Sequence, residues 1–419
     1  MRPQTDATTI PEVHNAVPVG RTRLFTTIWS LYLAQSIPIY LIVAAIPPIL
    51  RDLGVSRASI SLLWIMMLPF VIRFLWAPMV DRLGPLKGSH RRGWILPTQL
   101  GIVVALTGLS FANPSTVWPI YFFGIVVAIL ASTQDIASDG YATSMLAPND
   151  RPFGNAIQAS AVAVGVVLSS ALSLVIYDQF GWQPMILTVA ALSALPLFAI
   201  VAMPEDAGDM SVTRSSRPSL KGFFMRREVW EVFAIAIVYR AGDGLIKAME
   251  GPYLIDMAVP LSSIGYLNGS SAALAGIGGS FLVALVTTRI GTPAVLGALG
   301  GLRTICFAVF AGHAAGILDG VWTILGASML NTLLSYMEIV ALYNLYMAAC
   351  SREQPGTDFT ILSCATLAVY LGGSAIAGVF ADARGYVELF TVATCISALA
   401  TWLTLRLMGN GLRLRTATF

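Results

Sequence analysis

Charged residues are scarce in this sequence. Asp, Glu, Lys and Arg make up 11% of its 419 residues, whereas 56% of the residues are hydrophobic. An ordinary soluble domain carries about 25% charged residues, so this composition excludes one. The formal net charge of +3 is also too small to indicate a nucleic-acid-binding protein. In place of charge, the chain has apolar runs of about 20 residues, the length needed to cross a bilayer.

Histidine and cysteine are also few, which argues against metal and redox chemistry. The three histidines, at positions 14, 90 and 313, have no second candidate ligand at metal-binding spacing. The four cysteines form no CxxC pair and lie in apolar stretches, where small buried thiols are typical. The sequence also has no phosphate-binding Gly loop and no His-carboxylate pattern for acyl transfer. We therefore expect no metal, no cofactor and no enzymatic activity.

Twelve apolar stretches predict an all-α membrane protein with twelve transmembrane helices in two six-helix bundles. The N-terminal residues lack the apolar core of a leader, so we expect the first stretch to stay in the membrane. We expect a tail at 1–24, bundles at 25–203 and 229–408, a polar connector at 204–228 between them, and a tail at 409–419. The spans, numbered in chain order, are 25–50, 58–80, 94–112, 117–146, 154–177, 183–203, 229–257, 262–288, 293–313, 319–349, 358–380 and 386–408.

The basic residues predict the orientation of these spans. Most of the 25 lysines and arginines lie in the two tails, in the connector and in the loops on the same side of the membrane. Positively charged loops tend to stay in the cytoplasm. We therefore expect both termini and the connector to be cytoplasmic.

The two halves of the chain repeat weakly. Trp118 matches Trp322 at an offset of 204 residues, and Tyr32 matches Tyr239 at an offset of 207. A nearly constant offset over many spans indicates two equivalent bundles. Two parallel six-span repeats are the architecture of major facilitator transporters, with the solute site between the halves. Spans 1, 4, 7 and 10 are then equivalent.

Span 7 contains four charged residues whose spacing places them on one helical face: Arg240, Asp243, Lys247 and Glu250. An ionisable residue at the centre of a membrane helix costs about 2.5–3.5 kcal/mol on insertion scales, so this face must contact protein or a water-filled cavity. The four residues are either two structural pairs of opposite charge or one face of a transport cavity. We favour the cavity, because charges inside a membrane are functional by default. Span 1 has no charge at the matching positions.

Span 4 carries two carboxylates one helical turn apart, Asp135 and Asp139, next to Gln134. Two carboxylates this close in a low-dielectric environment suit reversible protonation, so we expect all three residues to line the substrate and proton pathway. The alternative is a role in helix packing, with Arg73 of span 2 neutralising one carboxylate. Glu338 of span 10 falls at the repeat position of Asp135 at an offset of 203. We expect the acidic groups of spans 4, 7 and 10 to converge on one cavity.

Two charged pairs are candidates for gating residues. They lie at neighbouring turns on the predicted cytoplasmic side: Asp81 with Arg82, and Asp150 with Arg151. We expect them to contact each other and to brace one conformation of a transporter whose halves rock against each other. The alternative for the basic residues of these loops is anchoring at the membrane surface.

Short motifs in the first half carry a resemblance to a known family. Residues 81–84 (Asp-Arg-Leu-Gly) resemble the loop signature of the major facilitator superfamily, although Ala77 replaces its leading Gly and a Pro-Leu pair its trailing basic residues. Residues 76–82 (Trp-x-Pro-x-x-Asp-Arg), 91–94 (Arg-Arg-Gly-Trp) and 134–139 (Gln-Asp-x-x-x-Asp) are similar to one branch of it. This branch contains the AmpG muropeptide permeases, the acetyl-CoA transporters and the RhtX/FptX siderophore permeases.

The resemblance implies a proton-coupled secondary transporter, a symporter, that imports a bulky polar organic solute across the bacterial inner membrane by alternating access. AmpG proteins usually carry additional hydrophobic segments, so the length of this chain is more similar to the RhtX/FptX group. A ferric siderophore is therefore the first substrate that we expect, a muropeptide the second, and a transporter-like sensor is a further alternative. We expect a monomer in the bilayer whose partners are the solute and protons, and no nucleic acid.

Overall fold

In lipid, a chain satisfies its backbone hydrogen bonds only as helices or as a closed barrel, and apolar runs of this length favour helices. The regular structure is indeed helical within the described residues, apart from an isolated bridge between Leu86 and Ser89. Most of the two predicted tails and the middle of the predicted connector lie outside them. The computed structural model describes residues 20–56, 59–60, 62–86, 89–204, 217–259 and 272–411.

The first bundle follows the six predicted spans of the N-terminal half. A π-helical turn at Leu41–Ala45 joins α1 to α2, and another at Leu168–Leu172 joins α8 to α9. Span 2 is the least regular, because Pro69 and Pro78 each stand in the first turn of a new short helix. The helices are α1 (Arg21–Tyr40), α2 (Ile46–Asp52), α4 (Leu68–Ile72), α5 (Ala77–Arg82), α6 (His90–Ser110), α7 (Val117–Met145), α8 (Arg151–Val167), α9 (Ser173–Phe180), α10 (Trp182–Ala194) and α11 (Leu197–Val201).

The second bundle follows a short helix near the end of the predicted connector. Its last helix, α20, consists of two helices that meet at Gly385, where a φ of 84° favours glycine. These two helices are the predicted spans 11 and 12. The helices of this half are α13 (Leu220–Met225), α14 (Val229–Val238), α15 (Asp243–Asp256), α17 (Ser280–Ile290), α18 (Thr292–Ala314), α19 (Val321–Ala349) and α20 (Pro355–Gly411).

Span 7 is broken in the middle. The helix α14 ends at Val238 and α15 begins at Asp243, with a turn between them. The prediction of one continuous helical face for its four charges was therefore wrong. The chain is closely packed at the break: a Cβ atom on Gly242 would lie 2.9 Å from the carbonyl oxygen of Ala393 in α20. Only glycine allows the two backbones to approach this closely.

The described helices agree with twelve spans. Nine helical segments are long and apolar enough to cross a membrane within the described part of the chain. One of these, residues 355–409, is the pair of helices divided by Gly385. Spans 2 and 7, which are broken into shorter helices at 62–82 and 229–256, complete the set. The protein is thus an all-α membrane protein built from two six-helix bundles.

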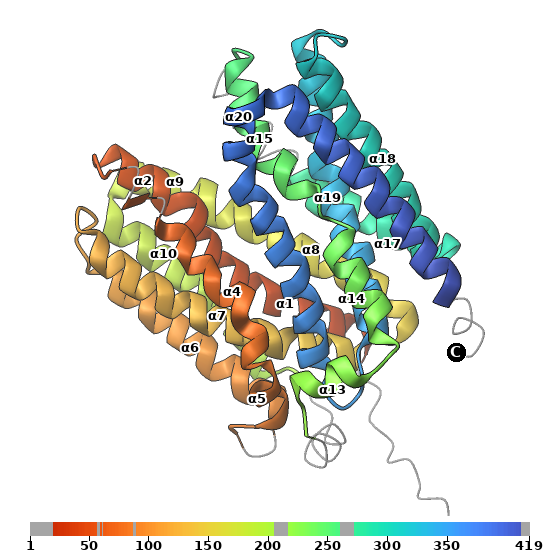
Figure 1. The fold of residues 1–419 in the computed structure, drawn as a ribbon. Helices are drawn as coiled ribbons and strands as arrows, with labels where there is room; N and C mark the ends of the chain where they lie inside the picture. Colours follow the sequence, from red (N-terminus) through yellow and green to blue (C-terminus); the bar gives the residue numbers. More distant parts are fainter. Residues whose placement is uncertain are drawn as a thin grey trace, which may run out of the picture.

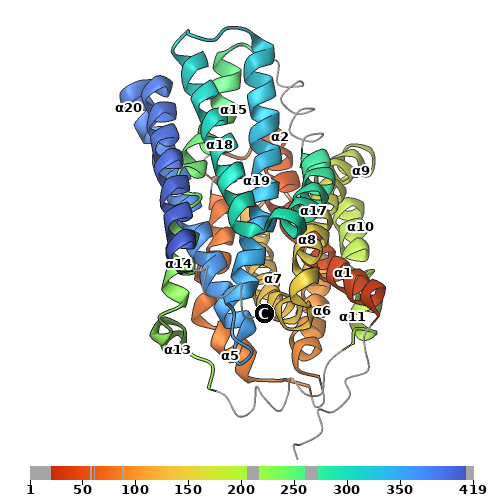
Figure 2. The same ribbon diagram turned by 90° about the vertical axis from the view of Figure 1, so that its right-hand side faces the viewer.

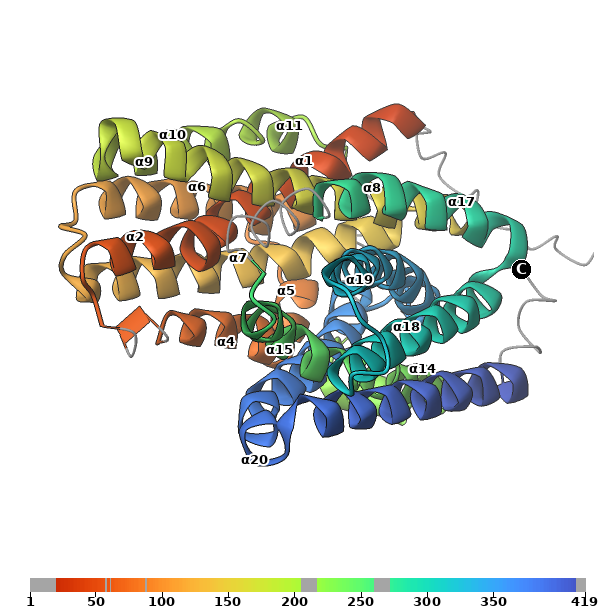
Figure 3. The same cartoon turned by 90° about the horizontal axis from the view of Figure 1, so that it is seen from above.

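The two bundles lie side by side, as the view from above shows most clearly (Figure 3). They meet where α8 packs against α17 and α19, and where α20 packs against α5 and α7. The helices α5 and α13 lie at the same end of the molecule, which we call the α13 end (Figures 1 and 2). The two arms of α20 join at the opposite end (Figure 1).

The bounds of the helices correct the register of the repeat. The helices α7 and α19 each have 29 residues, and both their ends differ by 204 positions. The positive-φ residues Gly181 and Gly385 are related by the same offset. Glu338 therefore corresponds to Gln134 and not to Asp135, so the offset of 203 was wrong. The offset of 207 between spans 1 and 7 stays a prediction, and the helix bounds give 204 for span 4.

Candidate functional site

The first polar network lies inside the N-terminal bundle, at the irregular part of span 2. Arg73 is buried and forms an ion pair with Asp135, and its Nη2 lies 3.7 Å from Oδ2 of Asp139. Tyr32 of α1 donates a hydrogen bond of 2.6 Å to Asp139, and Gln35 donates one of 2.6 Å to Asp135. Both carboxylates of α7 thus share the guanidinium of Arg73. The packing alternative had predicted that Arg73 neutralises one of them.

This first network has more negative than positive charge. One guanidinium balances one carboxylate, and the second carboxylate is left with neutral donors in a buried site. A buried charge without an opposite charge is costly, and a carboxylate can remove that cost by binding a proton. The site can therefore hold one proton. Arg73 also donates a hydrogen bond of 3.1 Å to Ser363 of α20, so the network contacts the other bundle.

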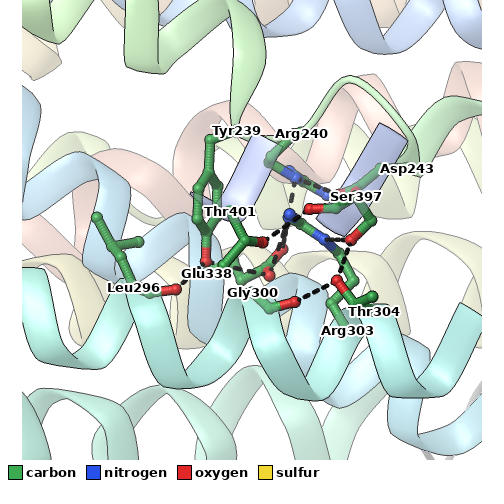
Figure 4. A network of polar contacts seen from close by, with 10 residues as sticks. All are labelled: Tyr239, Arg240, Asp243, Leu296, Gly300, Arg303, Thr304, Glu338, Ser397 and Thr401. Atoms are coloured by element: carbon green, nitrogen blue, oxygen red, sulfur yellow. Dashed lines mark hydrogen bonds and ion pairs between the residues drawn. The ribbon is translucent and has the colours of Figure 1, made fainter. Parts of the chain in front are cut away.

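The second polar network lies inside the C-terminal bundle and joins four charged residues (Figure 4). Arg240 Nε lies 2.5 Å from Oδ2 of Asp243, across the break in span 7. Arg303 of α18 donates to both carboxylate oxygens of Glu338, at 3.0 and 3.1 Å. Arg303 also lies 3.5 Å from Asp243, which links the two pairs. Two cations face two carboxylates, so this network is balanced.

Neutral groups complete the second network. Tyr239, in the turn of span 7, donates to the carbonyl oxygen of Leu296 at 2.8 Å and to Glu338 at 3.3 Å. The guanidinium of Arg303 lies 4.5 Å from the centre of the Tyr239 ring, in cation–π geometry. Its Nε donates to Ser397 of α20 at 3.0 Å. These contacts hold Arg303 from three sides, which fixes the geometry of the charge cluster.

The third cluster contains the remaining charges of span 7. Lys247 lies 3.0 Å from Glu250, and it also contacts Thr332 of α19 at 3.3 Å. Glu250 accepts hydrogen bonds from two residues of α19, Ser328 and, at 3.0 Å, Asn331. The Lys247 side chain is 37% exposed, whereas that of Glu250 is 4% exposed. Lys247 is thus far more accessible than its partner.

The structure brings together only part of what the sequence predicted. Asp243 of span 7 and Glu338 of span 10 do meet, but the span 4 carboxylates bind residues of spans 1 and 2 and belong to a separate network. The two networks lie in different bundles, and the convergence of these acidic groups on one cavity stays a prediction. Sequence reasoning also missed Arg303, although a lone arginine inside a predicted span signals that a carboxylate partner must exist. The sequence matched Tyr32 with Tyr239 but did not predict that either tyrosine binds a carboxylate.

At the α13 end, the carboxylate of a buried ion pair in the first bundle contacts the second bundle. Asp81 pairs with Arg91 at 2.6 Å, and it accepts a hydrogen bond of 2.5 Å from the backbone N–H of Thr357 in the first turn of α20. The N–H groups of a first helical turn have no partner within their helix, and a carboxylate satisfies them well. Arg91, which the sequence assigned to surface anchoring, is therefore part of an interface between the bundles.

The predicted partners of Asp81 lie elsewhere. Asp150 forms an ion pair of 2.7 Å with Arg21, and Arg82 is exposed. The prediction that Asp81 and Arg82 contact Asp150 and Arg151 was therefore wrong. The reason is that Asp81 is directed into the bundle interface below the start of α20, where the backbone donor and Arg91 occupy it.

The start of α20 is also bound to α13. Asp358 pairs with Arg226 at 2.6 Å and accepts hydrogen bonds from Ser351 and Gln354. Gln354 in turn accepts one of 2.8 Å from the backbone N–H of Ser219. The segment before and at the start of α20 thus contacts the first bundle through Asp81 and the α13 region through Arg226.

Comparison with known proteins agrees with this architecture. A sequence profile described as Major Facilitator Superfamily matches residues 28–242. The chain belongs to this superfamily and is a multi-pass membrane transporter. The structure is similar to that of the human organic anion transporter MFSD10, with a TM-score of 0.71 and 14% identity over 92% of this chain and 100% of that one. It is also similar to the proton:xylose symporter XylE, with a TM-score of 0.68 and 11% identity over 92% and 95%.

Within the superfamily, sequence similarity points to the AmpG branch. The chain is 28% identical over 350 residues to the anhydromuropeptide permease of Escherichia coli (strain K12), which covers 80% of this chain and 70% of that protein. It is 22% identical over 374 residues to the putative transporter AmpG 4 of Rickettsia felis, covering 84% and 89%. The branch predicted from the motifs of spans 2 and 4 is therefore confirmed.

Proposed function

We propose that this protein is a proton-coupled secondary transporter that carries a peptidoglycan fragment, an anhydromuropeptide, across the bacterial inner membrane. The similarity to the E. coli permease over 80% of the chain supports the substrate class. The observation that carries the coupling mechanism is the single guanidinium of Arg73 between two carboxylates, the partly buried Asp135 and the buried Asp139.

The proton acts through this charge imbalance. With one proton bound, the network is neutral and stable in a low-dielectric interior. Without the proton, the network carries one net negative charge. Contact with water or with a cationic group then stabilises it. Because Arg73 also contacts Ser363 in the other bundle, protonation changes an interaction between the two halves. A proton can in this way shift the equilibrium between two arrangements of the bundles.

The contacts of Asp81 serve as the gate of this mechanism. They join the bundles at the α13 end, so alternating access requires them to break when the other conformation forms. We place the α13 end, both termini and the 204–228 connector in the cytoplasm, because the basic residues lie there. We also propose that the two bundles span residues 25–203 and 229–408. The transporter acts as a monomer.

A ferric siderophore stays a second candidate substrate, and a sensor without transport a third. The siderophore rested on chain length, which is no property of a binding site. The experiment is uptake into sealed proteoliposomes of a labelled anhydromuropeptide or a labelled ferric siderophore, each with and without an inward proton gradient. We expect gradient-dependent uptake of the anhydromuropeptide. Uptake of the siderophore alone would replace the substrate, and no flux of either would leave the sensor.

A further inference from the structure

Lys247 differs from the other charged residues of the three clusters in being accessible. Its side chain is 37% exposed, whereas those of Arg73, Arg240 and Arg303 are 7%, 11% and 2% exposed. An ammonium group has three N–H donors. Two of them serve Glu250 and Thr332, so one is available on the exposed side. A cation held in place with one unused donor is suited to bind an anion.

The partner of Lys247 does not depend on it alone. Glu250 keeps hydrogen bonds from Ser328 and Asn331 of α19, one to each carboxylate oxygen. These neutral donors hold the carboxylate in place, and the carboxylate in turn orients the ammonium. The pair Arg240–Asp243 is different, because Arg303 and Glu338 enclose it on the buried side. Of these two pairs of span 7, the Lys247–Glu250 pair is the one with a more exposed side.

The contact of Lys247 with α19 lies one helical turn from the boundary between the bundles. Thr332, which Lys247 contacts, lies one helical turn before Tyr336 on α19. Gly276 lies between Tyr336 and the first bundle, because a Cβ atom on it would lie 3.3 Å from the Tyr336 ring and would clash with Ala163. The helix α15 also has open space beside this residue: a Cβ atom on Gly251, one turn after Lys247, would meet no atom within 4 Å.

We propose that Lys247 binds a carboxylate of the transported solute, with Glu250, Ser328 and Asn331 as the residues that position it. This inference rests on the proposed function and gives it a specificity-determining residue. The peptide part of a peptidoglycan fragment carries carboxylates, and the third N–H of the ammonium forms a charge-assisted hydrogen bond with one of them. The repeat places Tyr40 at the equivalent position of span 1, so the first half offers no second cation there.

The test compares two forms of one labelled anhydromuropeptide, the native form and one whose carboxylates are amidated. Initial uptake rates into proteoliposomes are measured at low solute concentration for wild type, Lys247→Met and the control Lys221→Met, which removes a lysine of α13. We expect wild type and Lys221→Met to prefer the native form. Lys247→Met should lose about tenfold in uptake of the native form, the value of one charge-assisted hydrogen bond, and keep its uptake of the amidated form.

Each outcome has a distinct meaning. If Lys247→Met lowers the uptake of both forms by the same factor, or keeps the preference of wild type, the carboxylate contact is refuted. The double variant Lys247→Met with Glu250→Gln keeps the site electrically balanced, so the preference can still be measured if the single variant does not fold. Failure of wild type to transport either form would instead refute the proposed function itself.

Discussion

The two bundles place different chemistry at the same positions. Gln99 of α6 donates a hydrogen bond of 2.6 Å to the carbonyl oxygen of Ser193 in α10. At an offset of 204, Arg303 of α18 donates to the hydroxyl of Ser397 in α20. The same offset relates the neutral Gln134 to the charged Glu338. The contact with the last helix occurs in both halves. The residues beside it, Gln99 and Gln134, are neutral in the first half, whereas Arg303 and Glu338 at the matching positions form an ion pair.

The comparison separates two uses of buried charge. In the second half, two arginines and two carboxylates balance, and each has several partners. In the first half, one arginine faces two carboxylates. A balanced cluster is stable without any change of protonation, whereas an unbalanced one responds to protons. We infer that the second half uses its charges to hold its helices together and the first half to sense the proton.

Removing the guanidinium of Arg303 from the balanced cluster should have the largest effect on the free energy of unfolding. We expect Arg303→Met to lower the free energy of unfolding by about 3–5 kcal/mol, because Glu338 then loses its main cation in a buried site. Gln99→Met, the matched change in the first half, should lower it by about 1 kcal/mol, since only a neutral hydrogen bond is lost. Thermal unfolding of the purified variants in detergent measures the difference.

A double variant tests the same comparison from the other direction. Arg303→Gln with Glu338→Gln copies the neutral residues of the first half, so it should recover most of the stability that Arg303→Met loses. Equal losses in Arg303→Met and Gln99→Met would show that the charge balance of the second half contributes nothing to its stability.

The unbalanced cluster should respond in transport and not in stability. We expect Asp135→Asn and Asp139→Asn each to reduce gradient-driven uptake to background, because one carboxylate then balances Arg73 and no proton is needed. The amount of folded protein should stay near that of wild type. Uptake into vesicles, normalised to protein and measured with and without a pH gradient, is the test.

The double variant Asp135→Asn with Asp139→Asn serves as the control. It leaves Arg73 without a carboxylate, and we expect the amount of folded protein in the membrane to fall. A single variant that still shows wild-type coupling would contradict the assignment of the proton to this cluster.

The smallest difference concerns the two tyrosines. Tyr239→Phe should lower the free energy of unfolding by about 1 kcal/mol and leave uptake unchanged, since Arg303 still donates two hydrogen bonds to Glu338. Tyr32→Phe removes a donor to Asp139, so it should change the pH dependence of uptake at nearly unchanged stability. Unfolding temperatures and uptake at several pH values distinguish the two. The same pH response in both variants would remove the contrast between the halves.

Much of the architecture could be predicted from local patterns. Length and hydropathy locate the spans, and an isolated arginine such as Arg73 needs a carboxylate that only a few positions can supply. The pairs Arg240–Asp243 and Lys247–Glu250 follow from spacing, and the structure contains both. The spans and the two pairs depend on residues that are close in the sequence. The partner of Arg73 is predictable because few charged residues lie within the membrane spans.

The rest depends on contacts between distant residues. No local pattern directs Asp81 to the backbone of Thr357, because that contact arises from how the two bundles meet. At the break in span 7, Gly242 packs against the backbone of α20, which is about 150 residues away in the sequence. The residue of the first half that matches Glu338 depends on the register of the repeat, and an error of one residue moves the match to another helical face.

The pair within span 7 has a consequence for how the protein is made. Spans enter the membrane in chain order, so Arg240 arrives before Arg303 and Glu338 have been synthesised. Asp243, three residues from Arg240, neutralises the guanidinium inside the same span and lowers the cost of its insertion. Arg73 has no acidic neighbour within its own turn and pairs with Asp135, about 60 residues later. Biosynthesis therefore exposes Arg73, and not Arg240, to a stage in which a cation in the membrane still lacks its counter-charge.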